Sequence, residues 1–411
     1  MNRVDILAKM KAGITNFFKN LKLKQIIYMA VIVLLVLTIF GLDLYRAQVV
    51  HRQYDQQMGQ RWSNETRCGQ VSMFFSENQG VGTDKINEYV YNINKGLIAD
   101  GLQEADASTQ GSGAVWNYCY SAVGSVELTR DLKSVTAVAI GIGGDYFQFH
   151  PMRVMSGNYF AGDTLMKDHI MLDEELAWQL FGSNNIVGQS ILIGGVPHYI
   201  DGVVKKDSGK YVKASGMIFP TVYMSFESLA TYGKIDASVL ATNGTLGKVD
   251  VASKNDDEAE SGTSDVEVQA KGIVCMEIVM PNTVDNYAKN FVIDKLQLNT
   301  TQVEVVDNTA RFENGNLFNL LTKFNTRGMQ TKPVIYPYWE NNARAYENIL
   351  AVVFLIQIIC AVIAFIMVAI IVVQAYRHRK WTVGMLVQKF VDWKYDVESN
   401  LKYHNEKWKY F

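Results

Sequence analysis

Two long apolar runs do most to limit what this chain can fold into. Residues 26–42 read IIYMAVIVLLVLTIFGL, and residues 349–373 read ILAVVFLIQIICAVIAFIMVAIIVV; neither run contains a charged residue. A helix of about 20 apolar residues crosses the hydrocarbon core of a bilayer. We therefore predict one transmembrane helix over 25–45 and a second over 349–373.

A cleaved signal peptide is the alternative interpretation of the first run. The apolar core of a signal peptide has about 7–15 residues and is followed by small residues at the cleavage site. The run at 26–42 is longer than that, and no A-x-A sequence follows it. A retained transmembrane helix is the better explanation.

The charges beside the two runs predict the orientation of the chain. Residues 1–24 hold six lysines or arginines against one acid, Asp5, and the second run is followed by Arg377-His378-Arg379-Lys380. Positively charged flanks stay in the cytoplasm. We expect both termini in the cytoplasm of a cell whose plasma (inner) membrane holds the chain, with residues 46–345 on the outer side.

Several function classes lack support in the sequence. The net charge is −2, and no basic patch with interleaved aromatic residues occurs outside the termini, so we expect no nucleic-acid partner. H-E-x-x-H, G-x-S-x-G and G-x-G-x-x-G are absent as motifs, so we expect no catalytic residues, no ATPase motif and no cofactor. His150, His169 and His198 are expected to be surface or turn residues rather than ligands.

The four cysteines do not form a metal motif, because no C-x-x-C occurs. Cys68 and Cys119 allow a disulfide in an oxidising compartment, although small buried apolar residues are the simpler interpretation. The acidic stretch 250–267 lacks the alternation of a calcium loop. It is expected to be a solvated loop, and we predict no metal site.

The segment between the two runs has the pattern of an α+β or α/β domain. Strand-like residues at 70–76, a helical spacing from Ile86 to Leu97 and a strand at 114–120 form one strand–helix–strand unit. A second unit has strands at 272–280 and 303–306, with a helix that Asn282 is expected to cap. Polar stretches at 46–65 and 339–348 are expected to be stalks.

A glycine-rich stretch at 181–204 begins like a phosphate-binding loop, but its spacing is wrong. Five residues separate Gly182 from Gly188, and Gln189 stands where such a loop needs lysine. Asp173-Glu174-Glu175 instead opens a short helix that ends at Gly182. The pair Gly194-Gly195 lies between two apolar runs and predicts a β-hairpin.

Residues 138–204 resemble the MacB-like periplasmic core domain of FtsX-like ABC transporter permeases. The matching phrases, in chain order, are Asp145-Tyr146-Phe147, residues 156–160 (SGNYF), residues 170–182 (IMLDEELAWQLFG), residues 185–190 (NIVGQS), residues 191–195, Tyr199 and Asp201-Gly202-Val203. Ile186 replaces the proline that is usual in the family. The resemblance implies a two-lobed domain over 66–338, with a middle lobe at about 130–225.

The resemblance also implies a segment that meets an ATPase in the cytoplasm. Residues 377–386 read RHRKWTVGML, with Lys380 in place of the usual glutamate and Trp381 in place of isoleucine. The candidate contact residues are Arg377, Arg379, Lys380, Gly384, Met385 and Leu386. Residues 1–24 are expected to form an amphipathic helix at the membrane surface, and 374–411 to hold the coupling segment and an amphipathic tail.

The function implied by the resemblance is mechanotransmission within an ABC-type export complex. Movement driven by a separate ATPase subunit reaches the external domain through the two spans. No third apolar run follows 373, so a second permease subunit is expected, either another copy of this chain or a four-span relative. The alternative is a two-span membrane receptor or adaptor whose external domain binds a ligand or partner without ATPase coupling.

Overall fold

The computed structural model describes residues 23–63, 65–76, 79–103, 114–160, 165–215, 217–238, 246–247, 249–251, 272–324 and 332–377, with helical residues at 384–385, 387–388, 390–392 and 394–395. Two compact units divide the chain: Met1–Tyr45 with Leu355–Phe411, and Arg46–Phe354. Residues 1–22 of the expected amphipathic helix and most of the acidic stretch 250–267 lie outside the described residues.

Two helices flank the middle of the chain, residues 52–337, in the sequence and are long and apolar enough to cross a membrane. They are α2 (Leu23–His51) and α11 (Tyr338–Arg377), with mean hydropathies of 2.6 and 3.2 over their most apolar stretches. Within the first unit, Gln357 on α11 donates from Nε2 to Asp43 Oδ1 of α2 at 2.9 Å. Such polar contacts between spans stabilise helix pairing where water is absent.

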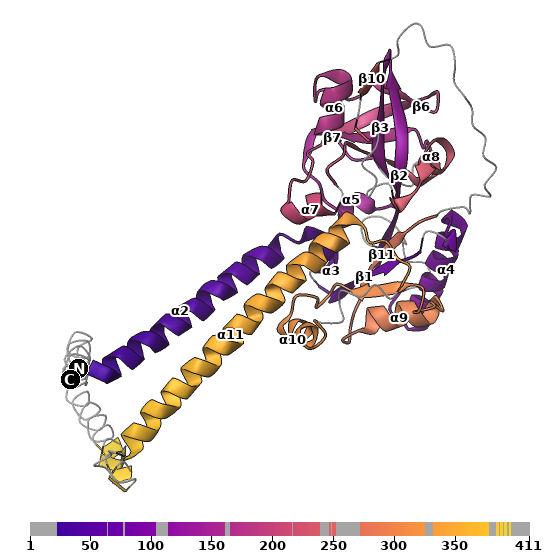
Figure 1. Ribbon diagram of the computed structural model, residues 1–411. Helices are drawn as coiled ribbons and strands as arrows, with labels where there is room; N and C mark the ends of the chain where they lie inside the picture. Colours follow the sequence, from indigo (N-terminus) through magenta and orange to yellow (C-terminus); the bar gives the residue numbers. More distant parts are fainter. Residues whose placement is uncertain are drawn as a thin grey trace, which may run out of the picture. The chain divides into compact units, whose positions relative to one another are not determined.

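The second unit is built on one mixed sheet of short and long strands (Figure 1). Its strands are β1 (Cys68–Phe74), β2 (Asn117–Arg130), β3 (Lys133–Gly144), β4 (Val154–Gly157), β5 (His169–Asp173), β6 (Ser190–Ile193), β7 (Val196–Val204), β8 (Thr221–Ser225), β9 (Lys234–Ile235), β10 (Val249–Val251), β11 (Cys275–Pro281) and β12 (Glu304–Asp307).

Strand β2 belongs to two lobes at once. Its first residues, 117–121, pair with β11, whereas Leu128 and Thr129 pair with β6. Around the second end of β2 the pairings close a circuit through β3, β8, β5, β7 and β6. We call this barrel-like lobe, which contains β3 and β5–β8, the middle lobe; β1, β11, β12 and the start of β2 form the sheet of the other lobe. The expected bounds of the domain and of its lobes stay a prediction.

Short helices cover both lobes. They are η1 (Tyr54–Gln56), α3 (Met58–Trp62), α4 (Thr83–Ala99), α5 (Tyr146–Phe149), α6 (Glu174–Phe181), α7 (Lys210–Ala214), α8 (Phe226–Tyr232), α9 (Tyr287–Lys295) and α10 (Asn314–Thr322). Helices α4 and α9 lie against the sheet of β1 and β11, and α6 and α8 flank the middle lobe (Figure 1).

The alternation of side chains along β1 separates two cores. Val71 and Met73 join the apolar cluster that also holds Ile93 of α4 and Phe291 of α9. Phe74 points to the opposite face, where it shares a second cluster with Trp339 of α11. Successive strand residues face opposite sides of a sheet. The same strand therefore buries one face under helices and the other against the start of α11.

The middle lobe confirms the local predictions for the glycine-rich stretch. Asp173 accepts a hydrogen bond at Oδ1 from the backbone N–H of Leu176 and so caps α6. Gly182 ends this helix with φ 69°, and Gly194 and Gly195 turn the β6–β7 hairpin with φ 56° and 78°. All three glycines adopt a conformation that side chains with a Cβ rarely take. These glycines serve turns.

The predicted N-cap of helix α9 needs a correction. Helix α9 begins at Tyr287, and Asn286, with φ 62°, holds the N-cap position without a capping side-chain bond. Asn282 lies four residues earlier but still accepts a hydrogen bond from the backbone N–H of Ala288 at 3.1 Å. Asn282 therefore satisfies the helix terminus from outside it, because a short turn separates it from the first helical residue.

Candidate functional site

Three polar side chains interrupt the apolar face that β1 and β11 turn toward α11. Gln70, Ser72 and Glu277 are each at most 2% exposed. Ser72 stands opposite Glu277 in the strand register and donates from Oγ to Glu277 Oε1 at 2.5 Å. Gln70 Nε2 lies 3.4 Å from the same oxygen. A buried carboxylate is costly unless both of its oxygens find partners.

His150 supplies the partner for the second oxygen. This residue follows α5, and its Nε2 lies 2.5 Å from Glu277 Oε2, while its Nδ1 lies 3.0 Å from Asp55 Oδ1 in η1. The imidazole ring also lies 4.3 Å, between ring centroids, from Trp339. Thus His150 joins the middle lobe, the β11 strand, the segment after α2 and the start of α11.

The surroundings of His150 decide its charge. Burial alone would lower the pKa of His150, but the charge of Glu277 and the hydrogen bonds to Asp55 and Glu277 outweigh burial and raise this pKa well above its usual value. His150 is therefore protonated at neutral pH and is shared by two carboxylates. Burial raises the pKa of neighbouring Cys119 to about 12, so its thiol stays neutral.

Cys119, His150 and Glu277 are also the one group, among the described residues, whose donors lie close enough to hold a metal ion. Their donor atoms lie within 4.8 Å of one another, and sulfur, imidazole and carboxylate are all zinc ligands. Both ring nitrogens of His150, however, already bond to carboxylates. We therefore interpret this group as a hydrogen-bonded ion cluster.

Arg311 forms a second buried cluster with α11. Its guanidinium binds Glu340 through Nη1 at 2.6 Å and Nη2 at 2.8 Å, and Glu347 through Nε at 2.6 Å and Nη2 at 3.3 Å. Nη1 also donates to Asn308 Oδ1 at 3.0 Å. All five N–H donors of the guanidinium are used. The two glutamates are seven residues apart, so they share one face of the helix.

The charges of this cluster balance one another away from water. Burial alone would raise the pKa of Glu340, but the attraction of Arg311 and Arg344 outweighs it, and this pKa lies below its usual value. Arg344 Nε contacts Glu340 Oε1 at 2.7 Å, and the Arg344 guanidinium lies 3.7 Å from the centre of the Tyr336 ring. Loss of one partner from such a cluster typically costs about 3–5 kcal/mol.

Asn308 connects the two clusters. Its Oδ1 accepts from Arg311, and its Nδ2 donates to Ser72 Oγ at 2.8 Å. Ser72 in turn donates to Glu277. We call the whole set the buried polar network; its members are Asp55, Ser72, His150, Glu277, Asn308, Arg311, Glu340 and Glu347. It links Asp55, four residues after α2 ends, to the first turns of α11.

The residues that the sequence assigned to an ATPase contact are only partly described. Arg377 is the exposed last residue of α11, and Gly384 and Met385 are helical and exposed. Arg379, Lys380 and Leu386 lie outside the described residues. The role of these six residues remains a prediction.

The disulfide proposed between Cys68 and Cys119 is wrong. Both thiols are buried and free, as the simpler interpretation predicted. Cys68 is on β1 and Cys119 on β2, and β11 lies between these two strands. Two strand spacings amount to about 10 Å, which exceeds the Cα separation that a disulfide can bridge.

The prediction that the histidines lie at the surface is wrong for His150 and His198. His150 and His198 are buried, at 1% and 0% exposure, and only His169 is half-buried. The sequence carried two signals for the network that were not used. One is Glu277 in the middle of the apolar strand 272–280, and the other is the pair Glu340 and Glu347 on one helix face. Their partner Arg311 is far from both in the sequence.

Comparison with known proteins identifies the domain. The family model of the MacB-like periplasmic core domain matches residues 51–270. The chain belongs to this family. It therefore carries the extracytoplasmic domain type of ABC transporter permeases, between two helices long and apolar enough to span a membrane. The narrower assignment to FtsX-like permeases stays a prediction.

Two relatives show how far the similarity extends. The macrolide export ATP-binding/permease protein MacB of Chromobacterium violaceum is 36% identical over 78 residues, which cover 18% of this chain and 12% of that protein. MacB 1 of Aeromonas hydrophila subsp. hydrophila is 30% identical over 113 residues, covering 27% of this chain and 17% of that protein. The chain thus matches less than a fifth of the length of these relatives.

Among solved structures, the periplasmic region of MacB from Actinobacillus actinomycetemcomitans is similar over 64% of this chain and 94% of its own length. The sequence identity is 12% and the TM-score is 0.34. The assignment to the MacB-like domain family rests on the match at residues 51–270.

Proposed function

We propose that this chain is a permease-type subunit that relays movement between a separate cytoplasmic ATPase and its MacB-like domain. The observation that carries the proposal is the buried polar network. Asp55 follows α2 in the sequence, Glu340 and Glu347 lie on α11, and both ends are bonded to the same sheet. A displacement of either helix end would strain hydrogen bonds in the centre of the domain.

The charges and helices of the chain support the proposed arrangement. The basic flanks at residues 1–24 and 377–380 favour a cytoplasmic position for both termini. Residues 46–345 then lie outside, and the segment from Arg377 to Leu386 is available to a cytoplasmic ATPase. We propose that the complex also contains a second permease subunit, either another copy of this chain or a four-span relative.

The test is purification of the full chain from its native membrane in a mild detergent, followed by mass spectrometry of the bound proteins. We expect an ATP-binding subunit with a P-loop motif at a fixed ratio. The double substitution Gly384→Asp, Leu386→Asp should abolish this association and leave membrane insertion intact. Gln388→Asp, at an exposed position two residues after this segment, is the matched control and should copurify normally.

Two results would reject the proposal. One is undiminished ATPase binding by the double variant. The other is a purified complex that contains no ATP-binding subunit, which would favour the receptor or adaptor alternative. The mass of the intact complex, measured by native mass spectrometry, distinguishes a pair of identical chains from a pair with a larger permease.

A further inference from the structure

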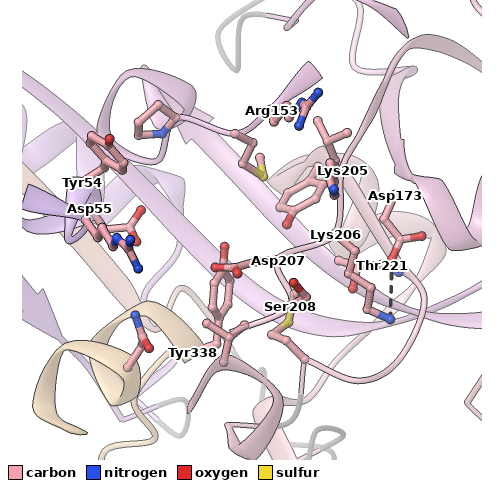
Figure 2. A pocket seen from close by; sticks show the side chains of 18 residues that line it. Tyr54, Asp55, Arg153, Asp173, Lys205, Lys206, Asp207, Ser208, Thr221 and Tyr338 are labelled. Atoms are coloured by element: carbon pink, nitrogen blue, oxygen red, sulfur yellow. Dashed lines mark hydrogen bonds and ion pairs between the residues drawn. The ribbon is translucent and has the colours of Figure 1, made fainter. Parts of the chain in front are cut away.

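A pocket of about 310 Å3 opens beside the buried polar network, between the middle lobe and the residues that follow α2. Tyr54 and Asp55 lie on one side of this pocket and Lys205 and Asp173 on the other, with Tyr338 of α11 between them (Figure 2). The volume is at the lower end of the range for small-ligand sites.

Three cations line the pocket without an ion-pair partner among the described residues. They are Arg52, Arg153 and Lys205, all exposed. Arg153 and Lys205 are held together because the backbone N–H of Lys205 donates to the carbonyl of Arg153 at 2.8 Å. Arg52 approaches from the segment after α2. The cations that line this pocket therefore come from two separate parts of the domain.

The lining carboxylates do not cancel this charge. Asp55 is bonded to His150. Asp173 is 2% exposed, accepts from the backbone N–H groups of Leu176 and Thr221, and lies 3.9 Å from Nζ of Lys206, a fourth lining cation. Asp207 alone among these lining acids is exposed, and it accepts from the backbone N–H of Gly209. Three unpaired cations against one exposed acid leave a surplus of positive charge at the opening.

The remaining walls supply a donor and an apolar floor. Tyr223 and Tyr338 line the pocket with their phenol groups. A phenol hydroxyl can donate one hydrogen bond to an acceptor on a ligand. Val212 and Met217 line the same pocket and are buried, so an organic group finds apolar surface next to the charged opening.

We propose that this pocket binds a small ligand that carries a phosphate group. Two guanidinium groups and an ammonium suit an anion with several oxygens, because arginine presents paired N–H donors to phosphate. A phosphate shared by Arg52 and Arg153 joins the segment after α2 to the middle lobe. Such binding does not require an ATPase partner, so a test of this proposal does not depend on the proposed function.

Isothermal titration calorimetry of the full chain in a nonionic detergent tests this proposal. The probes are inorganic phosphate, glycerol 3-phosphate and the short-chain lipid dihexanoyl phosphatidylglycerol below its micelle concentration. We expect saturable binding at one site per chain for at least one probe. Tighter binding of the lipid identifies a phospholipid headgroup as the source, and tighter binding of the other two identifies a free phosphate or phosphomonoester.

Matched variants locate the site. The double substitution Arg153→Gln, Lys205→Gln should weaken binding by about tenfold or more, since it removes two charged hydrogen-bond donors to the phosphate. Lys133→Gln changes an exposed lysine on β3 far from the pocket residues in the sheet and should leave the affinity unchanged. The melting temperature of each variant confirms that it is folded.

Three results would overturn the proposal. They are the absence of saturable binding for all three probes, equal weakening by Lys133→Gln, and binding of sodium acetate as tight as that of the best phosphate probe. The zwitterionic lipid dihexanoyl phosphatidylcholine controls for the acyl chains. If it binds as tightly as the phosphatidylglycerol, the apolar tails rather than an anionic headgroup account for the lipid signal, and the lipid result counts against the proposal.

Discussion

At the scale of single residues, His150 makes contacts of several kinds. It bonds to Glu277 and Asp55, and its ring lies against Trp339 and Tyr146. A protonated imidazole between two carboxylates is a strong interaction when it is shielded from water. The pH at which this proton is lost should therefore be visible in the stability of the whole domain.

We predict that the free energy of unfolding falls as the pH rises from about 7 to about 8. The folded-state pKa of His150 is raised well above its usual value, whereas histidine in an unfolded chain has a pKa of about 6.5. The stabilisation is complete below that value and is lost as the pH rises toward the folded-state pKa. One proton amounts to about 1 kcal/mol over this interval, which denaturant unfolding of the full chain in detergent can measure.

The variant His150→Gln is the control and should remove most of this slope. Other perturbed groups contribute less in the same interval, because the thiols of the unfolded chain, with a pKa of about 8.5, are still mostly protonated there. Asp173, with a pKa of about 6, is already ionised, and Cys119, with a pKa of about 12, is still protonated in the folded protein. An equal slope in the wild-type chain and in His150→Gln contradicts the assigned charge of His150.

At the scale of elements, the first turns of α11 depend on Arg311. We predict that Arg311→Lys lowers the free energy of unfolding by about 3 kcal/mol, because lysine cannot replace the paired contacts to Glu340 and Glu347. Hydrogen exchange should accelerate at residues 338–348, whereas α6, which does not contact Arg311, should keep its protection. Mass spectrometry of the exchanged peptides measures both.

A matched substitution separates this effect from a general loss of arginine. Arg67 contacts Asp285 at 2.6 Å, but the two side chains are 52% and 79% exposed. Exposed pairs contribute about 0–1 kcal/mol, so Arg67→Lys should change stability little. If both variants lose the same stability, the buried cluster has no special role in fixing α11.

The sequence predicted those helix ends and turns that depend on residues close together in the chain. Asp173 and Gly182 bound α6 because caps and αL glycines act within a few residues, and the Gly194-Gly195 hairpin follows the same logic. The buried polar network was not predicted, because Arg311 contacts Glu340 only through tertiary packing. His150 was placed at the surface because nothing near it in the sequence marks Glu277 as its partner.

At the scale of the whole molecule, β2 explains how two lobes act as one unit. It pairs with β11 at one end and with β6 at the other, so the barrel-like lobe cannot move without carrying a strand of the other sheet. The buried polar network crosses the same region from Asp55 to Glu347. The continuous strand β2 and the hydrogen bonds of the buried polar network therefore both cross the centre of the domain. Such connections allow the two lobes to move together when a flanking helix moves.

The proposed relay requires this domain to be outside the membrane that holds the two spans. We predict that Lys95→Cys, at an exposed position on α4, reacts with a small membrane-impermeant maleimide in intact bacterial cells that express the chain. The wild-type chain is the control, because Cys68, Cys119 and Cys275 are buried and burial raises the pKa of these three thiols. The fourth cysteine, Cys360, is half-buried and lies within the apolar run 349–373. Labelling of Lys95→Cys only after the cells are lysed would place the domain in the cytoplasm and reverse the proposed orientation. It would also remove any path by which a cytoplasmic ATPase could act on this domain through the two spans.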